Sequence, residues 1–209
     1  MKPYMVSLIS GGVDSAVLLW KYPGTIALTF DYGQTHKKEV EYAKRMCKRA
    51  RVEEHIILDI SDVFRKFSSA LLHSKEIMNT KSTIVPNRNM IFMSIAAGLA
   101  NSRDIHQISY GAHRTDAGSF PDCRLDFVDS IQTTIMLALD DLNFQVKAPF
   151  INLEKSDILQ IGYKLGAPIH DTWSCYRGGE IHCGTCPACI ERKKAFHKAG
   201  IVDETEYVS

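Results

Sequence analysis

Short apolar runs alternate with longer amphipathic stretches along most of the chain. The apolar runs are rich in Val, Ile, Leu and Phe, as expected of buried strands, and cover residues 4–9, 25–30, 55–60, 105–110 and 144–148. Helical spacing or composition predicts helices over residues 14–21, 37–51, 87–101, 124–139, 155–165 and 190–199. Strands separated by helices of this length predict an α/β fold with a doubly wound parallel sheet and right-handed crossovers.

Three segments carry further expectations. Small and apolar side chains surround most of the 87–101 helix, so this helix is predicted to be buried on nearly all sides. Gly166 directly follows the 155–165 helix and is expected to cap it in the left-handed conformation. Residues 68–85 are polar and lack periodicity, which indicates a long loop or a partly helical insertion that can fold over a site.

Composition and charge exclude several classes of protein. The 209 residues are 45% hydrophobic and 23% charged, which is typical of a globular domain and not of a disordered chain. With 25 Lys and Arg against 24 Asp and Glu, the chain has no global basic field for sequence-independent binding of nucleic acid. The apolar run 90–100 is too short to span a bilayer, and Asp14 interrupts the first apolar stretch where a signal peptide needs continuity. We therefore expect a cytoplasmic protein without a membrane partner.

The turn Ser10-Gly11-Gly12-Val13-Asp14-Ser15 joins the first predicted strand to the first predicted helix. In an open α/β sheet such a turn lies at the ligand-binding edge, and the N–H groups and dipole of the following helix attract phosphate. The turn lacks the lysine of a Walker motif and the glycine spacing of a dinucleotide fingerprint. A helix-capping turn without a ligand is the simpler alternative. Asp31-Tyr32-Gly33-Gln34 ends the second strand at the same edge and is either a border of the same site or an ordinary turn.

The glycine turn matches the Ser-Gly-Gly-x-Asp-Ser signature of the PP-loop ATP pyrophosphatases and resembles that family in its place after the first strand. The resemblance implies a Rossmann-like sheet of the adenine nucleotide alpha hydrolase type. It also implies that ATP is cleaved between its α and β phosphates, so that an acid or amide oxygen is adenylated and pyrophosphate leaves. The implied ATP-binding residues are Ile9, Ser10, Gly11, Gly12, Val13, Asp14 and Ser15, of which Ser10, Asp14 and Ser15 are also candidates for catalysis. Mg²⁺ is expected with the nucleotide.

Four of the six cysteines crowd into the tail, at Cys175, Cys183, Cys186 and Cys189. Their spacing can close around one tetrahedral ion, and zinc is predicted in a structural role because four thiolates leave no open position for water. An iron–sulfur cluster with the same ligands and a set of unmetallated thiols are the alternatives. His182 lies among the cysteines and is not expected to be a ligand. We assign residues 1–170 to a nucleotide domain and 171–209 to a zinc-binding segment packed on it.

Two more segments are candidates for substrate binding. Val85-Pro86-Asn87-Arg88-Asn89 opens a predicted helix, where Arg88 can grip a carboxylate or phosphate and Asn89 can pair with a heterocycle edge. Residues 115–124 follow the fourth strand and offer two aspartates, an aromatic ring and an arginine to a planar, guanine-like base. The alternatives are a capped helix with a solvated Arg88, and Asp122 as an N-cap beside a buried Cys123.

Taken together, the motifs resemble the 7-cyano-7-deazaguanine synthase family, QueC. The glycine turn, Val-Pro-x-Arg-Asn, Asp-x3-aromatic-Pro-Asp-Cys-Arg and the four cysteines occur in that family's order over residues 6–196. The resemblance implies an ATP-dependent ligase that converts 7-carboxy-7-deazaguanine and ammonia to the nitrile through adenylated acid and amide. Arg88 is implied in catalysis and in substrate binding, and the other implied substrate-binding residues are Asn89, Asp116, Phe120, Asp122, Cys123 and Arg124. A homodimer is expected, with the deazaguanine and ammonia as small-molecule partners.

The chain departs from the family pattern around the predicted base pocket. Phe120 stands where the family usually has Tyr, and Asn87 stands where it usually has Gly. Residues 111–114 (Gly-Ala-His-Arg) also differ from the more familiar stretch. These changes bear on the identity of the substrate more than on the adenylation step.

Three rival functions remain open from the sequence. A relative can activate the same carboxylate but stop at the amide or pass the acyl group to another amine, including one on a protein. A tRNA-modifying adenylase would use the cysteine tail and the basic residues Arg192, Lys193, Lys194 and Lys198 as a nucleic-acid-binding surface. A non-enzymatic nucleotide sensor would bind ATP without releasing pyrophosphate.

Overall fold

The computed structural model describes residues 3–73 and 79–208, and its centre is a five-stranded, fully parallel sheet. The strands are β1 (Val6–Leu8), β2 (Ile26–Asp31), β3 (His55–Asp59), β4 (Gln107–Ser109) and β5 (Gln145–Lys147), in the spatial order β3-β2-β1-β4-β5. This arrangement confirms the predicted fold class. The first and fourth predicted strands shorten to three residues each, because only their central residues pair with neighbours.

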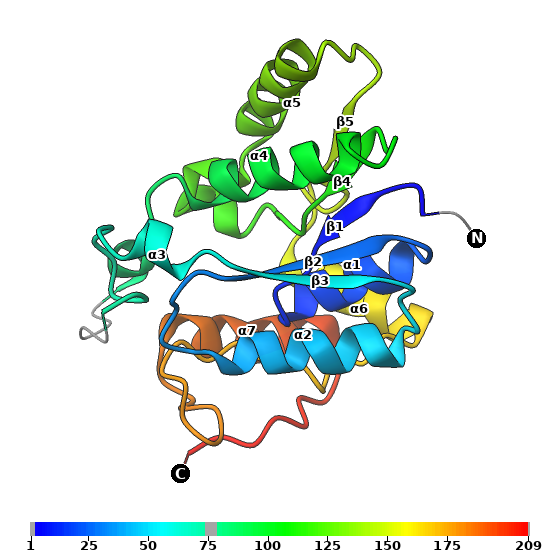
Figure 1. Ribbon diagram of the computed structural model, residues 1–209. Coiled ribbons are helices and arrows are strands. Elements are labelled where there is room, and N and C mark those ends of the chain that lie inside the picture. Colours follow the sequence, from blue (N-terminus) through cyan, green and yellow to red (C-terminus); the bar gives the residue numbers. More distant parts are fainter. Residues whose placement is uncertain (1–2, 74–78, 209) are drawn as a thin grey trace.

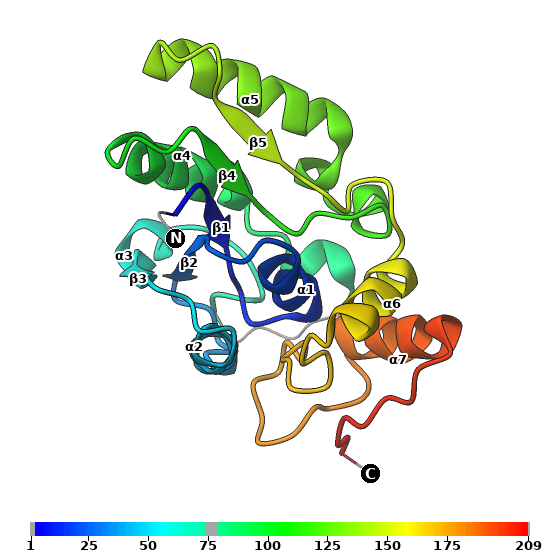
Figure 2. The same cartoon turned by 90° about the vertical axis from the view of Figure 1, so that its right-hand side faces the viewer.

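Helices cover both faces of the sheet (Figure 1). On one face, α4 (Arg88–Asn101) and α5 (Leu125–Leu139) pack their apolar sides on the strands in the largest hydrophobic cluster. On the other face lie α1 (Val13–Lys21) and α2 (Lys38–Arg49). Next to α1, α6 (Lys155–Leu165) and α7 (Pro187–Ala199) complete that layer, as Figure 2 shows from the side. The three helices share a second hydrophobic cluster. One further short helix, α3 (Ser61–Phe64), follows β3.

The structure contains all the predicted helices, with local differences in their bounds and exposure. Gly166 caps α6 with φ +68°, as predicted. Helix α7 begins three residues earlier than expected, because Cys186 is its N-cap and Pro187 occupies the first turn, where a missing N–H costs nothing. The prediction for α4 is wrong in one respect: Met90, Ser94 and Gly98, which are spaced four residues apart, lie along an exposed stripe. Small side chains around a helix therefore did not mean that all of its sides were covered.

The 68–85 segment is anchored at both ends. Ala70 and Leu71 are buried, and the carbonyl of Leu71 accepts a hydrogen bond from the N–H of Thr35. A single 3-10 turn, Thr80–Thr83, precedes α4 and buries Thr83. Residues 74–78 of this predicted loop lie outside the described residues.

The strand order reverses next to β1, since β2 and β3 lie on one side of it and β4 and β5 on the other. At such a point the connections that leave neighbouring strands run to opposite faces and open a crevice beyond the carboxyl ends of the strands. The glycine turn follows β1 directly and therefore lies at this crevice. In the described part of the chain, no helix combines the length and the apolar character needed to cross a membrane.

Candidate active site

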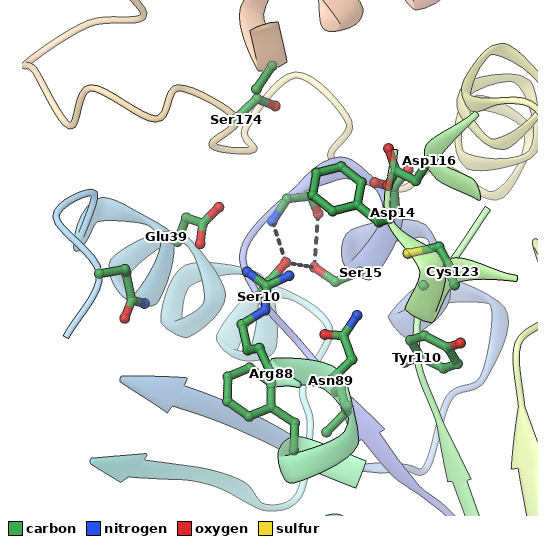
Figure 3. A pocket seen from close by; sticks show the side chains of 18 of the residues that line it. Ser10, Asp14, Ser15, Glu39, Arg88, Asn89, Tyr110, Asp116, Cys123 and Ser174 are labelled. Atoms are coloured by element: carbon green, nitrogen blue, oxygen red, sulfur yellow. Dashed lines mark hydrogen bonds between the residues drawn. The ribbon is translucent and has the colours of Figure 1, made fainter. Parts of the chain in front are cut away.

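One cavity lies at the crevice where the strand order reverses, and it brings the sequence motifs together. It is walled by the carboxyl ends of β1, β2 and β4, the first turns of α1 and α4, the 116–123 segment and parts of the cysteine segment. The predicted residues that line it are Ile9, Ser10, Gly12, Val13, Asp14, Ser15, Arg88, Asn89, Asp116, Phe120, Asp122 and Cys123. Gly11 and Arg124 do not line it. Figure 3 shows how side chains from these separate segments converge.

The glycine turn is held by its own hydroxyl groups. Ser15 Oγ accepts a hydrogen bond from the N–H of Gly11 at 3.2 Å and donates one to the carbonyl of Gly12 at 3.0 Å. Ser10 Oγ accepts from the N–H of Gly12 at 3.3 Å. The first bond of α1 runs from the N–H of Ala16 to the carbonyl of Gly12, so the N–H groups of residues 13–15 precede the helical ladder. They remain available to an anion in the cavity.

Gly11 is required by packing rather than by contact with a ligand. Its φ is +95°, and a Cβ atom at this position would lie 2.1 Å from the carbonyl oxygen of Glu39 in α2. A side chain here would push α2 away from the turn. Of the two glycines, Gly12 is the one that lines the cavity.

Asp14 belongs to a buried network of charges. Its Oδ2 lies 3.1 Å from Lys155 Nζ and 3.6 Å from His113 Nε2. Burial opposes ionisation of Asp14, but the two cationic neighbours outweigh it and hold the pKa of this carboxyl far below its usual range. Burial likewise opposes the charge on Lys155, yet Asp14 raises the pKa of this lysine above its usual value. The network therefore carries a fixed Asp14–Lys155 ion pair at neutral pH.

Arg88 begins α4 and reaches into the cavity. It donates a hydrogen bond from Nη1 to the hydroxyl of Tyr32 at 3.2 Å, while its buried Nε has no partner among the described residues. Tyr32 is held by Gln34, whose side-chain oxygen accepts from the N–H of Tyr32. The turn after β2 therefore borders the site, which decides between the two alternatives left open by the sequence.

The residue before Arg88 explains one departure from the family pattern. Asn87 adopts the left-handed conformation, with φ +59° and ψ +11°. Glycine enters this region without a steric penalty, and asparagine is one of the few other residues that does so readily. The substitution therefore preserves the backbone that aims Arg88 and Asn89 at the cavity.

The 116–123 segment forms the opposite wall. Asp116, Phe120 and Asp122 line the cavity. Asp122 does not cap α5, because the N-cap is Arg124 and no side chain bonds there. The alternative that Asp122 caps α5 is therefore wrong, and the Asp122 carboxylate makes no capping hydrogen bond to this helix.

Cys123 and Arg124 differ from their neighbours. Burial raises the pKa of the Cys123 thiol far above its usual value, so the group is a neutral thiol and a poor nucleophile. Arg124 is exposed, and its Nε donates to the carbonyl of Ala117 at 2.8 Å. Arg124 thus braces the segment from outside, and the structure does not bring it to the cavity with the other predicted residues.

The four cysteines predicted to bind metal are gathered into one cluster. All four Sγ atoms lie within 4.8 Å of one another, and Cys183 Sγ lies 3.9 Å from Cys189 Sγ. Four sulfurs at about 2.3 Å from one tetrahedral ion lie about 3.8 Å apart, so the arrangement fits a four-thiolate centre. Backbone N–H groups of Cys183 and Cys186 donate to the sulfurs of Cys175 and Cys183. His182 is not part of the cluster, as predicted; its Nε2 instead accepts a hydrogen bond from the N–H of Ser174.

Comparison with known proteins identifies the family of this chain. The family model described as queuosine biosynthesis protein QueC matches residues 4–200. The chain belongs to the QueC family. It is 43% identical to the 7-cyano-7-deazaguanine synthase of Caldicellulosiruptor saccharolyticus, over 97% of this chain and 94% of that protein. It is 42% identical to the enzyme of the same name from Archaeoglobus fulgidus, over 95% of this chain and 87% of that protein.

Among solved structures, the NH3-dependent NAD synthetase of Campylobacter jejuni has a similar fold. The TM-score is 0.51 at 20% identity, and the match spans 78% of this chain and 64% of that one. This likeness concerns the fold alone. The resemblance to QueC and the predicted parallel α/β fold are thus confirmed, and the chain is an enzyme of this family.

Several residues of this QueC chain's cavity escaped the sequence analysis. Lys155, Glu191 and Tyr176 line it, and His113 lies buried directly behind its wall. Lys155 and Glu191 resemble solvated helix residues in the sequence, since each stands in a polar stretch of an amphipathic helix. Of these missed residues, only His113 could have been suspected from the sequence, because it lies in the stretch 111–114 that departs from the family pattern.

The basic run considered for nucleic acid loses one of its four residues to the interior of the fold. Arg192 is fully buried and donates to Thr172, Thr205 and the carbonyl of Ile169. Lys193 bonds the carbonyl of Gly184, and Lys198 is paired with Glu154. Lys193, Lys194 and Lys198 are all exposed, so only Arg192 is withdrawn from the surface. Burial of Arg192 weakens the support for a nucleic-acid-binding tail.

Proposed function

We propose that this protein is an ATP-dependent ligase that converts 7-carboxy-7-deazaguanine and ammonia to 7-cyano-7-deazaguanine. The observation that supports this most strongly is the single cavity that joins the Ser10–Ser15 turn to Arg88, Asn89 and the 116–123 segment. A triphosphate site and a carboxylate-gripping arginine on two walls of one cavity suit the transfer of an adenylyl group to an acid. The names of the relatives agree with this reaction.

In the first step the substrate carboxylate attacks the α phosphate of ATP, and pyrophosphate leaves. The N–H groups of residues 13–15 would hold the phosphates at the start of α1. Arg88 lies where its guanidinium can bridge the carboxylate and the α phosphate, with its unpaired Nε still free to donate. This contact would orient the attack and stabilise charge that develops on the phosphorus.

In the second step ammonia attacks the acyl carbon, AMP leaves, and a proton is lost to give the amide. The amide oxygen then attacks the α phosphate of a second ATP, and a second pyrophosphate leaves. Loss of AMP and two protons from the activated amide yields the nitrile. Asp116, Asp122 and Asn89 would hold the deazaguanine edge, against the ring of Phe120. The neutral thiol of Cys123 has no covalent role in this scheme.

Two kinds of metal are part of the proposal. Cys175, Cys183, Cys186 and Cys189 would hold zinc in a closed site that supplies stability and no chemistry. An iron–sulfur cluster would use the same ligands, and metal analysis distinguishes the two. Mg²⁺ would accompany ATP, since it is usually bound by phosphates with one or two carboxylates, and Asp14 and Glu39 line the cavity.

The deciding experiment supplies ATP, ammonium and 7-carboxy-7-deazaguanine labelled with ¹⁸O in its carboxylate. Mass spectrometry should find the nitrile, pyrophosphate and AMP that carries ¹⁸O. Accumulation of the amide or of a conjugate with another amine would instead assign the chain to the acyl-transferring relatives. ATP binding without pyrophosphate release would identify a nucleotide sensor. The predicted homodimer is tested separately by the mass of the protein in solution.

A further inference from the structure

A second cluster of potential metal ligands lies apart from the cysteines, at the wall of the cavity. His113, Asp116 and Glu191 come from the segment after β4, the 3-10 turn that follows it, and α7. One ligand atom from each lies within 4.8 Å of the others. Two ligands on opposite sides of one ion at about 2.2 Å each lie about 4.4 Å apart, so a small inward movement of the side chains suffices for coordination.

Three polar atoms of this cluster, from His113 and Glu191, are buried without a hydrogen-bond partner among the described residues, while the Asp116 and Glu191 side chains as a whole are 28% and 31% exposed. The side chain of His113 is 0% exposed, and neither of its ring nitrogens makes a hydrogen bond within the described part of the chain. Glu191 Oε1 is also buried without a hydrogen bond to any described residue. Buried polar atoms are almost always paired, because an unpaired one costs about 1–3 kcal/mol. These atoms therefore point to a missing partner.

The charges around the cluster also indicate a missing partner, because carboxylates outnumber cationic groups there. Asp14, Asp116 and Glu191 supply three carboxylates, and Lys155 supplies one ammonium group, at 3.1 Å from Asp14 and 4.0 Å from Glu191. His113 Nε2 lies 3.6 Å from Asp14 Oδ2 and 3.3 Å from Asp116 Oδ2. With a protonated His113 the formal excess is one negative charge, and with the neutral imidazole that a metal requires it is two. A dication would balance it, whereas a water molecule would satisfy hydrogen bonds and leave the charge.

We propose that His113, Asp116 and Glu191 bind one transition-metal dication at the wall of the cavity. The imidazole nitrogen favours Mn²⁺, Fe²⁺ or Zn²⁺, since Mg²⁺ prefers oxygen ligands alone. Asp116 and Glu191 line the cavity while His113 lies behind it, so the open coordination positions face the bound reactants.

The test uses Mn²⁺ as the probe and the full-length protein without nucleotide, so its outcome does not depend on the proposed reaction. Electron paramagnetic resonance of free Mn²⁺ should show one ion bound per chain, and excess Mg²⁺ should displace it poorly. His113→Gln and Glu191→Gln should each weaken Mn²⁺ binding at least tenfold. Glu204→Gln, which changes an exposed carboxylate outside the cluster, should leave it unchanged.

A second readout guards against variants that do not fold. Electron spin echo modulation of the Mn²⁺-loaded wild type should contain a ¹⁴N coupling from one imidazole, and His113→Gln should lose it while melting normally. The proposal is overturned if the wild type binds no Mn²⁺, if the ¹⁴N coupling is absent, or if the two cluster variants bind as tightly as Glu204→Gln.

Discussion

Two arginines, in helices on opposite faces of the sheet, differ in how their buried guanidinium groups are paired. Arg192 in α7 is fully buried, and its guanidinium is satisfied by Thr205, Thr172 and the carbonyl of Ile169, with Asp203 at 3.4 Å. Arg88 in α4 makes one side-chain hydrogen bond, to Tyr32, and keeps a buried Nε without a partner among the described residues. The nitrogens of the Arg192 guanidinium all have hydrogen-bond partners, whereas Arg88 Nε has none among the described residues.

The same contrast separates the two regions that contain them. Around the cavity, Asp14, His36, Arg88 and Glu191 each keep a buried side-chain atom without a partner in the part of the chain described. In the cysteine segment, buried polar side chains such as Thr172 and His182 make hydrogen bonds inside the fold. Because an unpaired buried polar atom is costly, such atoms concentrate where a ligand will complete them.

The largest expected effect is on the free energy of unfolding, when Arg192 is replaced. Arg192→Met leaves Asp203 and the threonine hydroxyls without their partner, and the free energy of unfolding should fall by about 3–5 kcal/mol. Urea denaturation measures this. Lys194→Met is the matched control, since Lys194 is exposed on the same helix. If the two variants are equally stable, Arg192 does not have the structural role that distinguishes it from Arg88.

Replacing Arg88, whose Nε has no partner among the described residues, should instead affect activity. Arg88→Lys keeps the charge but loses the two-pronged contact, and kcat/KM for the carboxylate should fall about 100-fold or more, with little change in Tm. Arg124→Lys is the control, because Arg124 braces the neighbouring segment from outside the cavity. The idea fails if steady-state assays with nitrile detection find the two variants equally active.

Asp14 is an intermediate case, since it is paired with Lys155 and also lines the cavity. Its pKa is held below the ordinary 3.8, so its ionised form stabilises the fold above that pH and this contribution is lost as the pH falls toward the native pKa. The stability advantage of wild type over Asp14→Asn should therefore shrink as the pH is lowered from about 5 to about 2. Denaturation at several pH values measures it, and an advantage independent of pH would contradict the assigned pair.

The smallest effect is expected at the backbone that aims Arg88. Asn87→Ala forces a Cβ-bearing residue without a polar side chain into the left-handed region and should cost about 1 kcal/mol. Asn87→Gly should lie within about 0.5 kcal/mol of wild type, because glycine relieves strain but gains entropy when unfolded. Thermal unfolding resolves the order, and a glycine variant less stable than the alanine variant would refute the role of the left-handed conformation.

Much of the fold followed from periodicity, because strand and helix patterns are local. Helix α6 has the predicted bounds and the predicted Gly166 cap. The exposed stripe of α4 was not predictable, because Met90 looks like a core residue until one knows that no described element covers that side. Arg192 was assigned to a basic surface for the same reason, since a run of Arg and Lys does not reveal which member turns inward.

The sequence by itself determined the motifs whose members are adjacent: the Ser10–Ser15 turn and the four cysteines within residues 175–189. Their chemistry is encoded in short-range spacing, which the backbone preserves whatever the rest of the chain does. Only the tertiary structure decided which distant side chains complete each site. Lys155 meets Asp14 across 141 residues, and Glu191 reaches Asp116 because α7 packs beside α6 and α1. Such contacts depend on how helices cover the sheet, and no local pattern carries that information.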